Sequence, residues 1–160
     1  EALEQADLVV VTGGASVGQR DFAKTMFEPH GCEIIFSQVA IKPGKPVWLA
    51  RAKGRLVLGL PGNPTSAMVT ARLLLAPLVA GLCGRTGALE WTRVRLAGAL
   101  PAVGDRETFV RACSTAEGAQ PVANQDSSAQ RALAEADLLV RCRPGDAIRV
   151  PGEMVEALAF

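Results

Sequence analysis

The chain has 160 residues, 49% of them hydrophobic and 21% charged, so it can bury a core and form one ordinary domain or two small ones. Seventeen basic and sixteen acidic residues leave a net charge of +1, which gives no electrostatic case for binding nucleic acid or an anionic membrane. The 4 cysteines form no C-x-x-C pair, which argues against a zinc site and indicates reduced thiols in a cytoplasmic protein.

The N-terminal half alternates short apolar strands with helical segments. Leu8–Val11 is an unbroken apolar run, typical of a parallel strand that is covered on both faces. Residues 20–30 predict a short helix that Gly31 closes. Such alternation indicates an α/β layer with a parallel sheet. The other strands expected here are 32–41, 47–54 and 55–60, the last two joined by a Lys53–Gly54 turn.

A long helix is expected after residue 60. Asn63 suits the N-cap and Pro64 the first helical position, where a missing N–H costs nothing. Pro77 lies inside the apolar stretch and predicts a kink or a break. With Arg72 and two glycines, Pro77 makes this run too short and too interrupted to span a bilayer.

From about residue 88 the pattern changes to short strand-like runs every 8–12 residues, separated by Gly, Pro, Asp and Ser, which predicts a small all-β domain. We therefore expect two domains, 1–87 and 88–160. The expected strands are WTRVRLAGAL, ETFVRACST, AQPVAN, ADLLVRC and DAIRV…EMVEALAF, and SSAQRALAEA fits one helical turn.

The loop from Thr12 to Asp21 follows the first strand and carries the spacing G-G-x-x-x-G. Glycines let backbone N–H groups approach an anion, and a following helix N-terminus adds partial positive charge. The spacing is not that of a dinucleotide-binding loop, and Gln19-Arg20 stands where a P-loop needs Lys-Ser/Thr. The pattern fits either an anion-binding loop or a tight turn in which Asp21 starts the helix.

Two more loops follow strand-like runs, and strand ends are where open α/β sheets bind ligands. In KPGKP, prolines restrict the backbone around Lys42 and Lys45, so two ammonium groups on a stiff loop suit a small oxyanion. The alternative is a surface hairpin with solvated lysines. Residues 60–66, LPGNPTS, place the free N–H groups of a helix start and the Ser66 hydroxyl at a strand end; this is an anion site, a rigid capped turn, or both.

His30 is the single histidine, beside Pro29 and Gly31 at the end of the short helix. A C-terminal helix position or a surface role is expected for it rather than catalysis. With one histidine in that place, no Ser/His/Asp or Cys/His arrangement can be assembled. We therefore propose no covalent nucleophile.

Together and in this order, VTGGASVGQRDF, IKPGKP and GLPGNPTSA closely resemble the MoeA-type molybdopterin molybdenumtransferases, a family that includes the gephyrin E domain. Thr12 stands for the usual Ser and Ala15 for the usual Val. GDRETFVRA, NQDSSAQRALAEADLLV and PGEMVEALAF resemble the family's C-terminal β-barrel domain. The resemblance implies an incomplete molybdopterin-binding α/β domain over 1–87, with a mostly parallel sheet and helices on both faces. A β-barrel-like domain over 88–160 would follow it.

The resemblance implies the last step of molybdenum cofactor synthesis. Adenylylated molybdopterin is bound, its adenylate is hydrolysed with release of AMP, and molybdate is inserted into the dithiolene with Mg²⁺ present. It implies catalytic roles for Asp21, Lys42 and Lys45, with Asp21 also handling Mg²⁺. Molybdopterin or its phosphates would contact Thr12, Gly13, Gly14, Ser16, Gly18, Pro61, Gly62 and Asn63. Molybdate would contact Lys42, Lys45, Pro46, Ser66, Arg106 and Ser127, the last two closing the site from the β domain.

The front of the chain departs from the family pattern. No basic-then-apolar leader opens the chain, so nothing points to export. The chain begins at Glu1 and reaches a strand after only seven residues, whereas family members have two further N-terminal domains. In the family those parts reach across a homodimer to complete the active site. We therefore expect a C-terminal fragment that keeps much of the substrate-binding surface but does not turn over alone. The residues do not indicate whether molybdate or tungstate is preferred.

Two other functions stay open. The sister molybdopterin adenylyltransferase shares the α/β fold and a similar glycine loop, but KPGKP and the appended β domain argue against it. A gephyrin-like scaffold that anchors a partner peptide is the alternative from another class, and no groove for it is marked in the sequence. An unspecific α/β domain with a β appendage remains only if the three loops coincide by chance.

Overall fold

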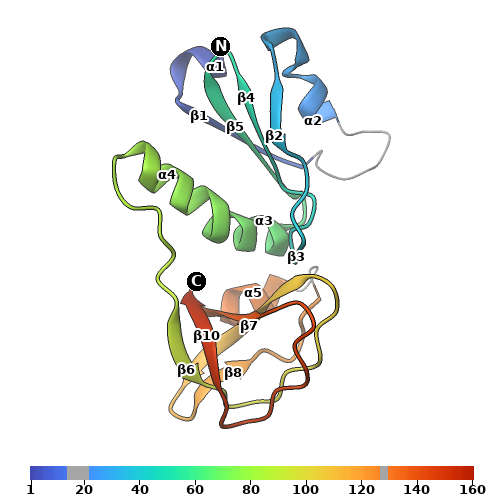
Figure 1. Ribbon diagram of the computed structural model, residues 1–160, viewed down its shortest axis with the longest axis vertical. Helices are drawn as coiled ribbons and strands as arrows, with labels where there is room; N and C mark the ends of the chain where they lie inside the picture. Colours follow the sequence, from blue (N-terminus) through green and yellow to red (C-terminus); the bar gives the residue numbers. More distant parts are fainter. Residues whose placement is uncertain (14–21, 127–129) are drawn as a thin grey trace. The chain divides into compact units, whose positions relative to one another are not determined.

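The computed structural model describes residues 1–13, 22–126 and 130–160, and these form two compact units (Figure 1). The first unit contains Glu1–Val39 and Gly44–Gly87. The second contains Ala88–Phe160 and, in addition, the short segment Ala40–Pro43. The predicted first domain of 1–87 is therefore interrupted by four residues, 40–43, that pack with the other unit.

The first unit combines a four-stranded sheet with short helices. Its strands are β1 (Leu8–Thr12), β2 (Glu33–Phe36), β4 (Trp48–Ala52) and β5 (Arg55–Leu60). Its helical elements are α1 (Ala2–Gln5), α2 (Phe22–Thr25), the 3₁₀ turn η1 (Glu28–His30), α3 (Pro64–Thr70), the π-helical turn η2 (Ala71–Leu75) and α4 (Ala76–Leu82).

The sheet is mixed, with strand order β1-β5-β4-β2. Only β1 and β5 run parallel, and the two remaining pairings are antiparallel. A mostly parallel sheet was expected, but short connections cannot return a chain to a parallel neighbour. The β4–β5 connection is a two-residue turn in which Lys53 and Gly54 both have positive φ, 48° and 73°, which is typical of a tight hairpin.

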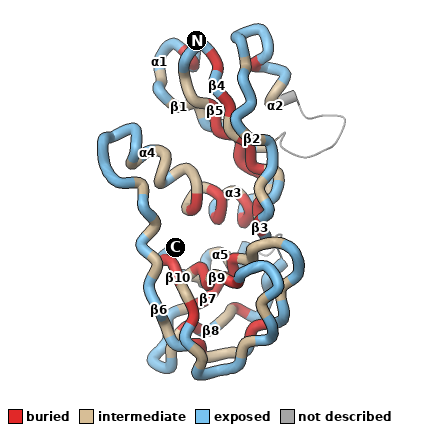
Figure 2. Tube along the Cα trace, in the orientation of Figure 1, coloured by how far each residue is buried: buried red, intermediate tan, exposed pale blue. Residues whose placement is uncertain are grey.

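Helices cover both faces of this sheet, as the resemblance implied. On β5, Val57 packs with Leu3, Phe27 and Trp48 on the face covered by α1, α2 and η1. The next residue, Leu58, packs on the opposite face with Val47 and Leu60 against the α3–η2 helix. This alternation follows from the strand period of two. Figure 2 shows buried residues along β4, β5 and α3.

One continuous helix runs over Pro64–Leu82, so Pro77 does not break it. The π-helical turn η2 precedes this proline, and the Ala76 N–H bonds to the Ala71 carbonyl five residues back. Local widening of the ladder is a common way for a helix to accommodate a disruption. The helix has 19 residues, is largely apolar, and is about 28% buried over its most apolar stretch. By its length and composition alone, this helix could therefore cross a bilayer, and the expectation that it is too short and too interrupted is wrong. Apolar helices in the cores of soluble proteins have the same length and composition.

The second unit is a six-stranded sheet with one short helix. Its strand order is β3-β7-β9-β10-β6, with β8 pairing with β7. All of these pairings are antiparallel except that of β3 with β7. The elements are β3 (Ile41–Lys42), β6 (Thr92–Arg95), β7 (Glu107–Thr115), β8 (Gly118–Pro121), α5 (Gln130–Glu135), β9 (Leu138–Cys142) and β10 (Met154–Ala159).

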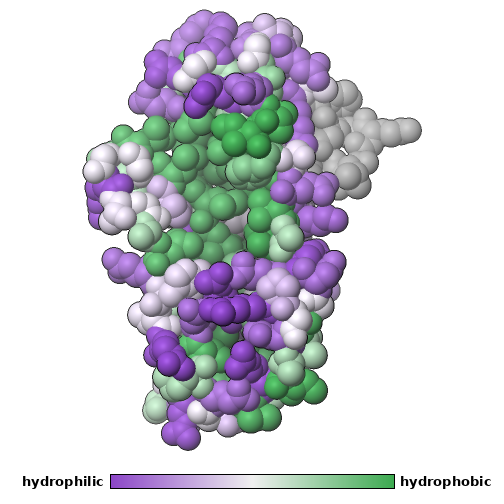
Figure 3. Space-filling model, in the orientation of Figure 1, coloured by the Kyte–Doolittle hydropathy of each residue, from purple (hydrophilic) through white to green (hydrophobic). Residues whose placement is uncertain are grey.

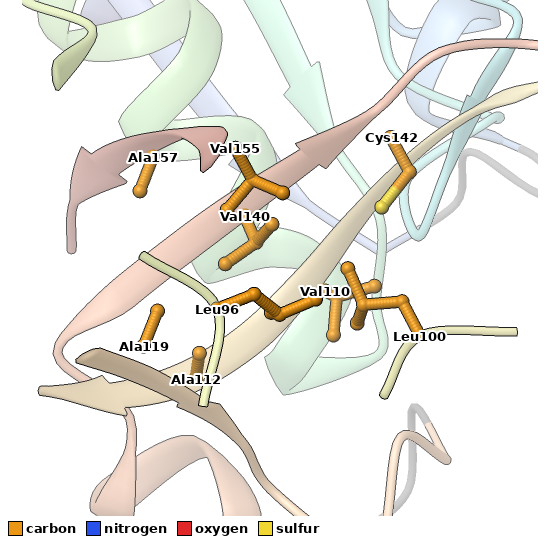
Figure 4. Close-up of a cluster of buried hydrophobic side chains, with 9 residues drawn as sticks. All are labelled: Leu96, Leu100, Val110, Ala112, Ala119, Val140, Cys142, Val155 and Ala157. Atoms are coloured by element: carbon orange, nitrogen blue, oxygen red, sulfur yellow. The ribbon is translucent and has the colours of Figure 1, made fainter. Parts of the chain in front are cut away.

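The second unit encloses an apolar interior, which Figure 4 shows in close-up. After β6, the Ala97 N–H donates to the Ala119 carbonyl at 2.9 Å, so the β6 end meets β8 and the sheet curls into a barrel-like form. Alternate residues of β7 and β9 point into this interior, and those between them point to the other face. The interior is formed by Leu96, Leu100, Val110, Ala112, Ala119, Val140, Cys142, Val155 and Ala157.

Candidate functional site

The first loop and the third loop meet at the carboxyl ends of the parallel strands β1 and β5. Thr12 pairs with Leu60 at the last position of the ladder, and the Gly13 N–H donates to the Leu60 carbonyl at 3.2 Å. A Cβ atom on Gly62 would lie 3.2 Å from the Gly13 Cα, tighter than most real Cβ contacts. Gly13 has φ of 81°, where a side chain is strained. The two glycines thus let two backbones approach each other at a strand-end edge, the expected place for a ligand.

The Pro64–Leu82 helix starts at this same edge. Asn63 is its N-cap as predicted: the backbone is extended, and the side-chain Oδ1 accepts the Ser66 N–H at 3.2 Å. Pro64 occupies the first helical position. The positive end of the helix dipole therefore faces the strand-end edge, which favours an anion there. Since the Ser66 N–H is used by the cap, the contribution predicted for Ser66 falls on its hydroxyl; the residue is 7% exposed.

Thr65 lies beside Ser66 in the first helical turn and was not expected to be functional. It is fully buried, and its Oγ1 has no hydrogen-bond partner among the residues that the structure describes. A buried hydroxyl without a partner costs free energy, so a ligand at this helix start would gain by bonding to it. Nothing in the local sequence marks this, because threonine is unremarkable in a helix start.

The KPGKP loop is a tight hairpin. The Val39 N–H donates to the Lys45 carbonyl at 3.0 Å, and the Val47 N–H donates to the Gly44 carbonyl at 3.1 Å. Lys42 and Lys45 are both exposed, and neither is ion-paired within residues 1–13, 22–126 and 130–160. Both interpretations of the loop therefore stay open: an anion site, and a surface hairpin with solvated lysines. Pro46 follows Lys45 and is half-buried.

The two lysines nevertheless belong to different units. Lys45 lies in the first unit, whereas Lys42 ends β3, which pairs with β7 of the second unit. Lys42 is opposite Thr108, whose hydroxyl donates to the Arg106 carbonyl at 3.2 Å. Lys42 and Arg106 were both predicted to contact molybdate, and β3 brings Lys42 to the strand start that Arg106 precedes.

Arg111 on β7 is a residue that the sequence analysis missed. It is only 1% exposed, and its Nη2 donates to the Asp126 carbonyl at 3.1 Å. Its Nε and Nη1 have no partner in the described part of the chain. Burial lowers the pKa of this guanidinium, while the nearby Asp126 charge opposes that shift. An uncompensated buried cation is costly, so this group is suited to an anion.

A sequence signal for Arg111 did exist. Arg111 interrupts the run Phe109, Val110, Ala112, all of which are buried, and a charge inside an otherwise buried strand needs a partner. It was overlooked because the ETFVRACST segment was assigned to the strand as a whole. Arg106, chosen instead, is half-buried.

Several predicted site residues cannot be placed. Gly14, Ser16, Gly18, Asp21 and Ser127 lie outside the described residues, so their roles stay predictions. No group of three or more His, Cys, Asp or Glu that could hold a metal ion occurs among the described residues. His30 ends η1 and is exposed, as its position beside Gly31 predicted. All four cysteines are free thiols.

The sequence matches two known protein families, one in each unit. Residues 1–81 match the family described as "probable molybdopterin binding domain", and residues 93–160 match "MoeA C-terminal region (domain IV)". A solved structure described as a "molybdopterin biosynthesis moea protein from Pyrococcus horikosii" covers 99% of this chain with a TM-score of 0.82 and 31% identity; the match covers 38% of that chain.

Curated relatives agree with these matches. A Haemophilus influenzae protein named molybdopterin molybdenumtransferase is 48% identical over 84 residues, which are 52% of this chain and 20% of that protein. The Drosophila melanogaster molybdenum cofactor synthesis protein cinnamon is 35% identical over 147 residues, 88% of this chain and 24% of that protein. The matched region is thus between a fifth and a quarter of these relatives' length. The chain belongs to the MoeA-type family of molybdopterin proteins.

Proposed function

We propose that the chain serves the insertion of molybdate into adenylylated molybdopterin, with release of AMP, in molybdenum cofactor biosynthesis. The observation that carries this proposal is the close approach of Gly13 and Gly62 where the parallel strands β1 and β5 end and the Pro64–Leu82 helix begins. Such an edge offers backbone N–H groups and a helix dipole to a phosphate. The names of the relatives supply the substrate class.

The pterin phosphate belongs at this glycine edge. Thr12 and Gly13 end one strand, while Pro61, Gly62 and Asn63 end the other. Bulky side chains would block the approach of a ligand to the backbone there, so glycines at both loops serve binding as well as turning. We assign the first loop's remaining residues, Gly14, Ser16 and Gly18, to the same phosphate.

Molybdate needs cationic and hydroxyl groups to replace its hydration. We assign it the residues that the resemblance implies, which are Lys42, Lys45, Pro46, the Ser66 hydroxyl, Arg106 and Ser127. Arg111 of the second unit is a further candidate for anion binding, because its buried guanidinium has two donors, Nε and Nη1, without a partner in the described residues, and each can donate a charge-assisted hydrogen bond. In this proposal the protein contributes positioning and charge neutralisation rather than a covalent intermediate.

Magnesium enters the proposal only through Asp21. A bound Mg²⁺ would neutralise charge on the adenylylated substrate's phosphates. The residues that the structure describes contain no carboxylate cluster for it, so we derive no step through this ion.

We also propose that the full-length protein acts as a homodimer in the cytoplasm. Apolar side chains gather on the face of the first unit shown in Figure 3, and exposed large apolar side chains of this unit include Ile35 at 50% and Met68 at 53%. Exposed apolar patches of this kind mark interaction surfaces, and a second copy is the occupant we assign. Sedimentation equilibrium of the full-length protein and of its Met68→Glu variant tests this: a monomeric full-length wild type would overturn it.

Binding of molybdate to the 160-residue chain, measured by isothermal titration calorimetry, tests the proposal. Lys42→Met and Lys45→Met should each weaken the affinity by about fivefold in low salt, since each removes one partly screened charge. Lys53→Met is the matched control, because Lys53 is an exposed lysine of the first unit that pairs with Glu4 at 3.3 Å. Equal effects of all three substitutions would contradict the assignment.

Chemistry is tested separately from binding, with adenylylated molybdopterin, molybdate and Mg²⁺ as reactants and AMP release as the readout. We expect binding without robust turnover by the chain alone. Production of adenylylated molybdopterin from ATP and molybdopterin would instead establish the sister adenylyltransferase activity.

A further inference from the structure

Gln125 makes three hydrogen bonds to backbone, an unusual number for one side chain. Its Oε1 accepts the Arg111 N–H at 3.0 Å, and its Nε2 donates to the Arg111 carbonyl at 2.9 Å. The same Nε2 donates to the Val122 carbonyl at 2.8 Å. An amide group that both donates to and accepts from one residue reproduces what a neighbouring strand would do.

This side chain continues the β7–β8 ladder where β8 has ended. The last registered pair is Ala112 with Pro121, and the next backbone bond runs from the Val122 N–H to the Arg111 carbonyl at 3.0 Å. Between Ala112, where the pairing with β8 ends, and Thr108, where β3 pairs, no strand pairs with this edge of β7 among the described residues. Gln125 therefore completes the hydrogen bonding of Arg111, whose backbone is buried.

The same contacts fix the guanidinium. Arg111 Nη2 donates to the carbonyl of Asp126, the residue directly after Gln125. The Gln125 amide is hydrogen-bonded to the backbone of Arg111, and the Asp126 carbonyl accepts a hydrogen bond from the guanidinium at the far end of the side chain. With both ends held, the planar guanidinium keeps a fixed orientation, so the unpaired Nε and Nη1 donors each keep a fixed direction of their own, which is the preorganisation that an anion site requires.

We infer that Gln125 is a positioning residue for oxyanion binding: it acts through Arg111 and does not touch the ligand. The inference rests on the proposed function insofar as the oxyanion is molybdate. A purely structural role for Gln125 would stabilise β7 without depending on the Arg111 side chain, so the two roles separate experimentally.

The test uses Gln125→Met, which keeps length and removes all three hydrogen bonds, and Gln125→Glu, which keeps the acceptor and removes the donors. Each should weaken molybdate binding to the 160-residue chain by roughly tenfold, the effect of losing well-formed hydrogen bonds around one group. In an Arg111→Met background the same substitutions should cause no further loss, because the group through which they act is gone. Gln120→Met is the matched control, since Gln120 is exposed and bonds only to the adjacent Pro121 carbonyl.

Further weakening in the Arg111→Met background, or wild-type affinity in both Gln125 variants, would overturn the inference. The ¹⁵N–¹H signal of Arg111 Nε separates its failure from that of the proposed function. This signal should be single and sharp in the wild type and broadened in Gln125→Met, whether or not molybdate binds. If wild-type chain binds no molybdate but the signal behaves in this way, the proposed function fails and the positioning role stands. An unchanged signal removes the positioning role.

Discussion

In the proposed function, the two units would bind an anion by different means. In the first, the site is built from backbone: Gly13 and Gly62 bring two loops into contact, and Asn63 starts a helix that points its dipole at them. In the second, it rests on one buried side chain, Arg111, with two unpaired donors. Substitutions that add side-chain volume should disturb the backbone site most, whereas substitutions that remove the charge should disturb the site at Arg111 most. Their responses to substitution should therefore differ in kind.

The largest expected effect comes from adding one methyl group to Gly59 in the first unit. A Cβ there would lie 2.0 Å from the ring of Trp48, which is fully buried opposite Gly59 on β4. Gly59→Ala should lower the free energy of unfolding by about 3 kcal/mol, since overpacking forces a large ring to move. Urea denaturation measures this.

Gly81→Ala is the matched control for that substitution. Gly81 lies in α4, and a Cβ there meets nothing within 4 Å. Its replacement should raise the free energy of unfolding by about 0.5 kcal/mol, because alanine is the better helix former. Equal destabilisation by both variants would show that the first unit is not limited by close backbone packing at Gly59.

Arg111→Met should separate binding from stability in the second unit. Loss of the guanidinium charge together with a charge-assisted hydrogen bond should weaken molybdate binding on the order of a hundredfold. The free energy of unfolding should stay the same or rise by about 1 kcal/mol, since an apolar side chain replaces a poorly compensated buried charge. Calorimetric titration and thermal melting measure the two quantities. Arg131→Met, at an exposed arginine paired with Glu135 on α5, should change neither.

Cys142 sharpens the contrast, because it is another buried ionisable group of the second unit, it lies in the apolar interior, and no anion is proposed for it. Burial raises the pKa of its thiol from 9.0 to about 11, with Asp146 adding to the shift. Between these values the unfolded chain loses the proton while the folded chain keeps it. Stability should therefore be complete below pH 9 and fall as the pH rises toward 11, by about 1.4 kcal/mol for each unit of difference between the two pKa values.

Cys142→Ala should remove that alkaline loss, as measured by denaturation between pH 8 and pH 11. Cys83 is exposed, so Cys83→Ala is the control and should leave the pH dependence unchanged. An unchanged slope in Cys142→Ala would show that another group titrates there.

The sequence predicts the backbone site of the first unit better than it predicts the burial of Arg111. The Gly13 and Gly62 loops, the Asn63 cap and the β7 limits follow from local rules of turns, caps and alternation, which act over a few residues. The burial of Arg111 depends on the 122–126 segment folding over β7, which no local pattern reports.

The mixed sheet and the Pro64–Leu82 helix show the same limit. Composition favoured a parallel sheet, but the short turn at Lys53–Gly54 imposes an antiparallel pair. Pro77 predicted an interruption, yet packing of the helix against β5 and the π-helical turn before the proline keep it continuous. Likewise, the pairing of β3 with β7 places residues 40–43 in the second unit. The sequence of these four residues does not predict this long-range pairing.

The smallest effect is expected at Asn63, where cap and binding roles coincide. Asn63→Ala removes the acceptor of the Ser66 N–H and should cost about 1 kcal/mol of stability. Asn63→Asp keeps that acceptor and adds a negative charge at the helix start, so stability should be preserved or slightly raised. The same charge repels an anion, and inorganic phosphate binding by Asn63→Asp should fall about fivefold below wild type. If the aspartate variant instead binds phosphate as well as wild type does, then the helix start does not face the ligand, and Asn63 is a cap alone.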